Sequence, residues 1–229
     1  MNIKNAQTRA YARHLLDDNV FGKDWLKAAF THFMIDGLVV FMGYFWYCLA
    51  LVGITFGLII GYDYPVWSAV ILFVSCILPV VMFYAFIGPI QVGISAVYID
   101  LVRGERVRIR KFFSGFRHFG SNAVVGIMYI LQVALWSCFF IIPGIYMSYS
   151  YALVFHVKRD HPDYNWKHCF DESERLMEGN RWKLFTLTLS HIGWFILGTL
   201  FLCCGSYWAE PYMYTSTAIF YETVRSERG

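Results

Sequence analysis

The sequence predicts an all-α integral membrane protein with six transmembrane helices, arranged as three repeated hairpins. Of its 229 residues, 58% are apolar and only 15% are charged, whereas soluble domains are usually about 45–50% apolar and about 25% charged. Several charge-free runs exceed the roughly 18 apolar residues that indicate a membrane-spanning helix. The 19 Lys and Arg residues gather in four clusters, and the connections between these clusters hold none.

The distribution of basic residues predicts the orientation. Lys and Arg are confined to residues 1–27, 103–117, 158–183 and 225–228. Cytoplasmic loops collect Lys and Arg, so these segments and both termini are expected in the cytoplasm. The connections at 53–65, 141–145 and 203–211 contain no basic residue and are assigned to the outside.

Six spans follow from this sorting, at about 28–50, 66–102, 121–141, 144–157, 184–204 and 207–224. The second would form a helix of about 55 Å, although the hydrocarbon core is about 30 Å thick. Pro79 and Pro89 are expected to kink it, so that part lies tilted or along the interface. Four crossings between residues 28 and 102 are an alternative with the same orientation. The fourth span is short and must thin the bilayer or share its helix with the turn.

An internal repeat supports the hairpins. The segments PIQVGISAVYIDLVRGER, from Pro89, and PYMYTSTAIFYETVRSER, from Pro211, align without gaps. The alignment matches Asp100 with Glu222 and Arg103 with Arg225. A weaker copy runs from Pro143 to Asp160. The repeat units are about 6–106, 107–160 and 161–229, within one membrane domain of residues 1–229.

An amphipathic segment precedes each outward span. In residues 109–119 an apolar stripe faces charged residues, and it consists of Ile109, Phe112, Phe113 and Phe116. Residues 163–178 repeat this pattern, with Asp163 as the expected N-cap and Gly179 as the expected stop, and residues 6–18 do so more weakly. These segments predict interfacial elbow helices, with the apolar face in the acyl boundary and the charges toward the headgroups.

Several strings resemble a known bacterial family of multi-span proteins. They are LWSCFFIIPGIYMSYSYALVFHV (135–157), ESERLMEGNRWKLFTLTLSHIGW (172–194) and PYMYTSTAIFY (211–221). The chain is similar to the domain-of-unknown-function family numbered nine hundred seventy-five, and distantly to the membrane domain of glycerophosphodiester phosphodiesterases. The resemblance implies a multi-pass protein of the bacterial plasma membrane and brings no biochemical activity. Where such proteins usually read Ser-Phe-Ile-Gly-Trp, this chain has His191 in place of Phe.

Three ionisable side chains within the predicted spans are candidates for a polar site. His32 and Asp36 share one helix face in the first span, and His191 lies at a similar depth in the fifth. Ionisable groups at membrane depth are costly and mark functional candidates. They can relay protons, hold a cation or position a lipid headgroup; the alternative is an interhelical hydrogen bond that orients the spans. No HExxH-type spacing is present, so we expect no metal and no cofactor.

The loop after the second span predicts contact with anionic lipid. Its candidate residues are Arg103, Arg106, Arg108, Arg110, Lys111 and Arg117. Each such charge near an anionic leaflet contributes about 1 kcal/mol, although the cluster can also serve topology alone. Asp100 is expected to pair with Arg103 at the interface. Trp25 and Trp182, each near a lysine ahead of an outward span, are expected to anchor the chain at the interface.

The sequence favours a protein that is not an enzyme. It has no Gly-rich phosphate loop and no Ser–His–Asp ordering, and its basic residues sit beside spans, so no nucleic-acid partner is expected. We expect a membrane protein that binds lipid or a membrane partner, in envelope organisation, in support of a transporter or in immunity to a membrane-active peptide. The alternative is a small transporter or channel with a polar site around His32, Asp36 and His191.

Overall fold

The computed structural model describes residues 5–16, 23–61, 63–200 and 206–228, and every regular element in these ranges is helical. The all-α class is confirmed for this part of the chain. The elements are α1 (Asn5–Leu15), α2 (Lys23–Ile60), α3 (Pro65–Val102), α4 (Ile109–Phe112), the 3-10 helix η1 (Phe113–Phe116), α5 (Phe119–Phe139), α6 (Ile141–Ser150), α7 (Val154–Asp160), α8 (Trp166–Met177), α9 (Arg181–Leu200) and α10 (Ser206–Arg228).

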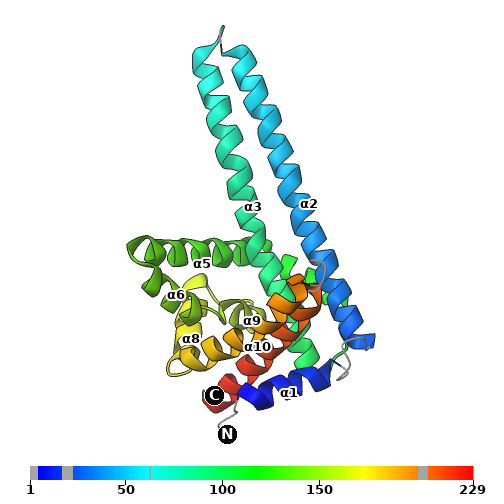
Figure 1. Ribbon diagram of the computed structural model, residues 1–229. Helices are drawn as coiled ribbons and strands as arrows, with labels where there is room; N and C mark the ends of the chain where they lie inside the picture. Colours follow the sequence, from blue (N-terminus) through cyan, green and yellow to red (C-terminus); the bar gives the residue numbers. More distant parts are fainter. Residues whose placement is uncertain (1–4, 17–22, 62, 201–205, 229) are drawn as a thin grey trace.

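A long arm of two helices rises from a base of shorter ones (Figure 1). The helices α2 and α3 each have 38 residues and are therefore about 57 Å long. The first span was expected at 28–50, but α2 continues to Ile60 because no charge or proline interrupts it. Residues 66–102 were expected to form either one kinked helix or more than one crossing. They lie in α3, which is one continuous helix through Pro79 and Pro89.

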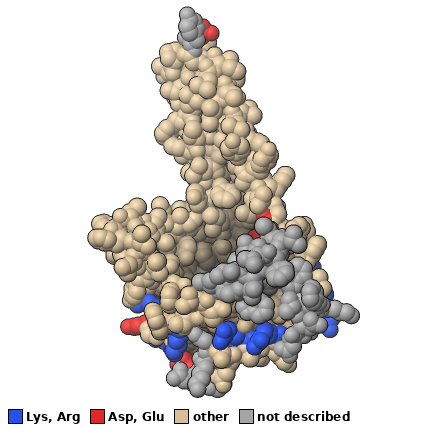
Figure 2. Space-filling model, viewed as in Figure 1, with Lys and Arg blue, Asp and Glu red and all other residues tan. Residues whose placement is uncertain are grey.

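Among the described residues, three helices are long and apolar enough to cross a membrane. They are residues 25–60, 65–102 and 119–139. Figure 2 shows that the arm presents no Lys or Arg on the face in view, whereas these residues gather across the base. The arm exposes many large apolar side chains, among them Val40, Phe41, Tyr44 and Phe73. An apolar surface of this extent is typical of a membrane-embedded segment, which is consistent with a membrane protein.

The other three predicted spans do not appear as membrane-length apolar helices among the described residues. The predicted span 144–157 is broken, because α6 ends at Ser150 and α7 begins at Val154. The spans at 184–204 and 207–224 correspond to α9 and α10, and residues 201–205 between them lie outside the described residues. The helix α5 runs across the direction of the arm (Figure 1). Six crossings and the orientation of the termini stay predictions.

The apolar face of the second amphipathic segment is covered by protein, and only its charged face is exposed. The expected apolar face of α8 exists, but Cys169, Phe170, Ser173 and Met177 are buried within the protein. Neighbouring helices of the base, α7 among them, cover this face. Gly179 has a φ of +73° and confirms the expected stop. The N-cap is Asn165, whose side chain accepts a hydrogen bond from the Trp166 N–H, and the expectation of Asp163 was wrong.

The helices α4 and η1, which follow α3, form an elbow with one buried face and one exposed face. The predicted apolar segment 109–119 is divided between α4 and η1. Phe112 is buried against α3, where a Cβ on Gly93 would overlap the carbonyl oxygen of Phe112. Ile109 and Phe113 are exposed. Half of the predicted apolar stripe therefore packs into the base, and the other half remains available at the surface.

The helices α3 and α5 cross at two glycines. A Cβ on Gly88 would overlap the carbonyl oxygen of Asn122, and a Cβ on Gly126 would lie 2.5 Å from the Cα of Gly88. The Asn122 side-chain amide donates a hydrogen bond to the carbonyl oxygen of Gly115 at 2.6 Å. Small residues allow backbones to approach this closely, so the sequence of α3 fixes where α5 leaves the arm.

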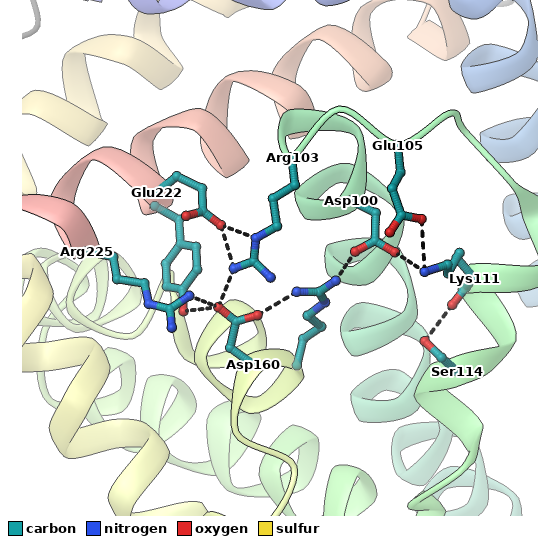
Figure 3. Close-up of polar contacts among 10 residues, drawn as sticks. Asp100, Arg103, Glu105, Lys111, Ser114, Asp160, Glu222 and Arg225 are labelled. Atoms are coloured by element: carbon teal, nitrogen blue, oxygen red, sulfur yellow. Dashed lines mark hydrogen bonds and ion pairs between the residues drawn. The ribbon is translucent and has the colours of Figure 1, made fainter. Parts of the chain in front are cut away.

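The ends of α3, α7 and α10 meet in a cluster of ion pairs (Figure 3). The Arg103 guanidinium, just past α3, contacts Asp160 at 2.8 Å and Glu222 at 2.7 Å. Asp160 also pairs with Arg225 and accepts a hydrogen bond from the Tyr221 hydroxyl at 3.0 Å. The charged exits of the three predicted repeats therefore contact one another, although they are far apart in the sequence.

Asp100 has different partners from the one expected. It pairs with Arg159 and with Lys111, whose Nζ lies 2.8 Å away, whereas Arg103 contacts Asp160 and Glu222 instead. The physical reason is that α3 ends at Val102, so the chain turns and Arg103 reaches α7 and α10. The expectation of an Asp100–Arg103 pair was wrong.

The Asp160 carboxylate depends on these cations. Its side chain is only 4% exposed, and a buried charge is tolerated only when it is paired and hydrogen-bonded. Burial would raise its pKa, but hydrogen bonds and charge from Arg103 and Arg159 outweigh burial and hold the pKa below the ordinary value of 3.8. Asp160 is therefore ionised at neutral pH and stabilises the folded state.

We expect the Asp160→Asn variant to lower the free energy of unfolding by about 1–3 kcal/mol, because it removes the charge shared by three arginines, whose partial exposure reduces the cost. The measurement is equilibrium unfolding in detergent micelles, followed by tryptophan fluorescence. Asp171→Asn is the matched control, since Asp171 is exposed on α8 and its substitution should change the stability by less than about 0.5 kcal/mol. Equal stability of the two variants would contradict a central role for Asp160.

The same cluster predicts an acid-dependent loss of stability. A carboxylate whose pKa is lowered by folding contributes stability above its unfolded pKa, and this contribution is lost as the pH falls through the folded pKa. The wild type should therefore lose stability as the pH falls below 3.8. Asp160→Asn should show a smaller loss over this window, and an identical pH profile for both proteins would oppose this assignment.

We expect Gly126→Val to lower the free energy of unfolding by about 1–3 kcal/mol, because the added side chain collides with the α3 backbone. The matched control is Gly120→Ala in the same helix, where a Cβ meets no atom within 4 Å. That substitution should leave the stability unchanged or raise it by up to about 1 kcal/mol. The same unfolding assay measures both variants, and a neutral Gly126→Val would show that the crossing can widen freely.

Candidate functional site

A cavity of about 250 Å³ lies where α2, α3 and α10 meet, at the root of the arm. Its wall is largely apolar. The polar side chains that line it are those of His32, Asp36, Gln91, Glu210 and Tyr214. A mostly apolar cavity with a few convergent polar groups is typical of a small-ligand site.

His32, Asp36 and Glu210 form a compact acid–histidine cluster in this cavity. The spacing of four residues places His32 and Asp36 on the same face of α2, and Glu210 comes from α10, next to Pro211. The Nδ1 atom of His32 lies 3.3 Å from Oε2 of Glu210. One ligand atom from each of the three side chains lies within 4.8 Å of the others.

The surroundings of His32 are aromatic and leave hydrogen-bonding capacity unused. The residue is 2% exposed, and its ring lies 4.9 Å from that of Tyr214 and 5.4 Å from that of Tyr98. Around this cluster, three buried atoms have no hydrogen-bond partner among the described residues, namely His32 Nε2, Glu210 Oε2 and the Tyr98 hydroxyl oxygen. Unsatisfied buried polar atoms are rare in native proteins, so the cluster calls for a chemical explanation.

His191 lies apart from this cluster. Its Nδ1 contacts the carbonyl oxygen of Leu187 at 2.6 Å, its Nε2 contacts the Ser216 hydroxyl at 3.2 Å, and its ring lies 4.7 Å from that of Tyr212. It does not line the cavity of His32 and Asp36. The structure therefore brings together two of the three predicted residues and supplies Glu210 as the third member.

One feature of the sequence could have identified Glu210 as a site residue. It is the single charged residue in the connection 203–211, and that connection was assigned to the outer face because it lacks basic residues. The predicted spans therefore separated Glu210 from His32 and Asp36. In the structure the three residues lie in one cluster, so the predicted separation was wrong, whereas the side of the membrane that they face stays a prediction.

The six predicted lipid-facing cations divide into two groups. Arg103 and Lys111 are engaged in the ion-pair cluster, where Lys111 contacts both Asp100 and Glu105. The other four are exposed and form no ion pair with any described residue; they are Arg106, Arg108, Arg110 and Arg117. The basic surface is thus narrower than the sequence predicted.

An apolar groove of about 620 Å³ lies between α2 and the α4–η1 elbow. Its lining residues on α2 are Phe30, Phe33, Met34, Ile35, Gly37, Leu38 and Phe41, and those on the elbow are Ile109, Phe112 and Phe113. Arg108 and Arg110 flank Ile109 in the chain. One edge of this apolar groove is therefore formed by a residue that stands between two exposed arginines in the chain.

The two predicted tryptophan anchors differ in their environment. Trp182 is 73% exposed and stacks on Phe185 with ring centroids 5.0 Å apart, as an interface anchor requires. Trp25 is 4% exposed and stacks on Tyr212 of α10 at 6.1 Å. The expectation for Trp25 was wrong, because α10 covers the ring that was expected to face the headgroups.

Comparison with known proteins gives one match. Residues 138–228 match the family described as protein of unknown function (DUF975). No curated protein and no solved structure matches the chain. The match supports the resemblance to a family of unknown function, and it covers the segment that carries Asp160, Glu210 and Glu222 but not the arm.

We expect Trp25→Ala to lower the free energy of unfolding by about 3 kcal/mol or more, because it opens a cavity between α2 and α10. Trp182→Ala is the matched comparison and should change the stability by less than about 0.5 kcal/mol. Unfolding in detergent measures both variants. Similar effects for the two tryptophans would count against the packing role of Trp25.

Proposed function

We propose that this protein is a non-enzymatic membrane protein that binds an anionic phospholipid in the groove between α2 and α4. The observation that carries the proposal is the apolar groove, one of whose lining residues, Ile109, stands between the exposed arginines Arg108 and Arg110 in the chain. An acyl chain fits the apolar bed, and a phosphate fits the guanidinium groups, which bind phosphate through paired N–H donors.

Two features of the groove favour lipid over a soluble ligand. Its lining is almost wholly apolar, with Phe30, Phe33 and Phe41 exposed on α2. It also lies along the first part of α2, between Phe30 and Phe41, next to the elbow, and the proposal puts this level at the boundary between headgroups and acyl chains. A lipid there would touch charge and hydrocarbon at once.

The proposed setting is the plasma membrane of a bacterium, with multiple passes and both termini in the cytoplasm. The basic residues at the base support this orientation through the positive-inside rule. A protein that holds lipid and exposes a long apolar arm suits envelope organisation, support of a transporter or immunity to a membrane-active peptide. The proposal also includes a membrane-protein partner that packs along the arm.

A small transporter or channel is the second candidate. The observation that favours it is the acid–histidine cluster of His32, Asp36 and Glu210 at the root of two membrane-length helices. Transporters place polar groups of this kind on a substrate path near the membrane midplane.

We expect the double variant Arg108→Gln/Arg110→Gln to bind anionic phospholipid about 10- to 30-fold more weakly, since each charge contributes about 1 kcal/mol. The measurement is titration of the detergent-purified protein with phosphatidylglycerol, followed by native mass spectrometry, with phosphatidylcholine as the neutral lipid. The charge-matched control is Arg117→Gln/Lys167→Gln, which removes two exposed cations that are not next in the chain to any groove-lining residue.

A groove-filling variant tests the acyl-chain bed separately. Gly37 lines the groove, and a Cβ there meets no atom within 4 Å, so Gly37→Phe should displace lipid without disturbing packing. Cysteine-accessibility labelling confirms that each variant keeps its orientation. The proposal fails if both double variants weaken binding equally, or if Gly37→Phe binds phosphatidylglycerol like the wild type.

A further inference from the structure

We propose that His32, Asp36 and Glu210 form a binding site for one divalent transition-metal ion. This inference rests on the cavity at the root of the arm and is independent of the lipid groove, because none of the three side chains lines that groove. The site joins α2 to α10, two helices from opposite ends of the chain.

The donor set suits a metal of intermediate softness. One imidazole nitrogen and two carboxylates are ligands of zinc, manganese, iron and cobalt, whereas calcium and magnesium prefer oxygen alone. Metal–ligand distances of about 2.0–2.2 Å at tetrahedral angles place neighbouring ligand atoms about 3.3–3.6 Å apart. The observed 3.3 Å between His32 Nδ1 and Glu210 Oε2 has this spacing.

The charge balance of the cavity calls for a cation or a shared proton between the two carboxyl groups. Asp36 and Glu210 lie close together in a cavity whose described lining holds no Lys or Arg. Two carboxylates this close in an apolar setting repel strongly unless a cation or a proton lies between them. A divalent ion neutralises both charges and accepts electron pairs from both carboxylates and the imidazole.

The unsatisfied atoms include one that the proposed metal would bind. Glu210 Oε2 is buried and has no hydrogen-bond partner although it faces His32 Nδ1. Both atoms carry a lone pair when Nδ1 is the unprotonated nitrogen, and two lone pairs that face each other are the arrangement of two ligands of one ion. The buried His32 side chain lines the cavity, and its Nε2 is then the protonated nitrogen beside Tyr98 and Tyr214.

The cavity leaves the proposed ion exchangeable. Three protein ligands leave a coordination position open to water or to a further ligand, which is typical of catalytic rather than structural sites. The cavity volume of about 250 Å³ accommodates such a ligand, and Gln91 and Tyr214 lie beside it as polar neighbours. The ion would therefore bind reversibly and clamp the arm to α10 while it is bound.

The test is cobalt binding by the full-length protein in lipid nanodiscs. The protein is first treated with a chelator, then titrated with Co²⁺ while visible ligand-field absorption is recorded, and bound metal is counted by elemental mass spectrometry. We expect one Co²⁺ per protein, with intense absorption from a four- or five-coordinate site. Asp36→Asn and Glu210→Gln should each weaken binding at least tenfold, because each removes one charged ligand.

The matched control is His191→Gln, which changes a buried histidine outside the cluster and should leave cobalt binding unchanged. Retained phosphatidylglycerol binding shows that the ligand variants are folded, since the groove shares none of these side chains. The proposal is overturned if the wild type binds no more Co²⁺ than empty nanodiscs, or if both carboxylate variants bind it like the wild type. Higher stability of these variants without any change in cobalt affinity would identify a shared proton in place of the metal and would likewise overturn it.

Discussion

The buried Asp160 carboxylate is the constraint on which the base of the molecule depends. It lies at the end of α7 and is held by Arg103, Arg159 and Arg225. A buried charge without partners is strongly unfavourable, so the ends of α3, α7 and α10 can separate only by leaving charges unpaired. Figure 3 shows how few side chains make this junction between three distant segments.

Both candidate sites follow from that junction. The helix α10 is fixed at its carboxyl end by Arg225, and its preceding turns then bring Glu210 against α2. The elbow α4 is fixed by the contact of Lys111 with Asp100, and this places Ile109 at the edge of the groove that α2 also lines. The ion pairs bind neither lipid nor metal, but they position the elements that line the groove and the cavity.

The sequence patterns predicted local features such as the apolar face of a helix. They could not predict which residues from distant segments contact one another. The 3.6-residue period identified the face of α8 that carries Cys169 and Phe170, but it could not tell protein from acyl chains as the cover. The repeated charged exits were visible, yet the partner of Asp100 depends on where α3 ends. Glu210 lay outside any pattern with His32, because only the packing of α10 on α2 brings them together.

The helix α2 carries the two sites on neighbouring faces. His32 and Asp36 line the cavity, whereas Phe33 and Gly37, each one residue further along, line the groove. Successive residues of an α-helix are rotated by about 100°, so a lipid chain and an ion can occupy the two sites without contact. A hydropathy profile shows one uniformly apolar helix, because only the helical period separates these faces. The apolar side chains of α2 therefore serve as the wall that keeps a polar cavity out of the hydrocarbon, and the lipid groove forms the outer surface of that wall.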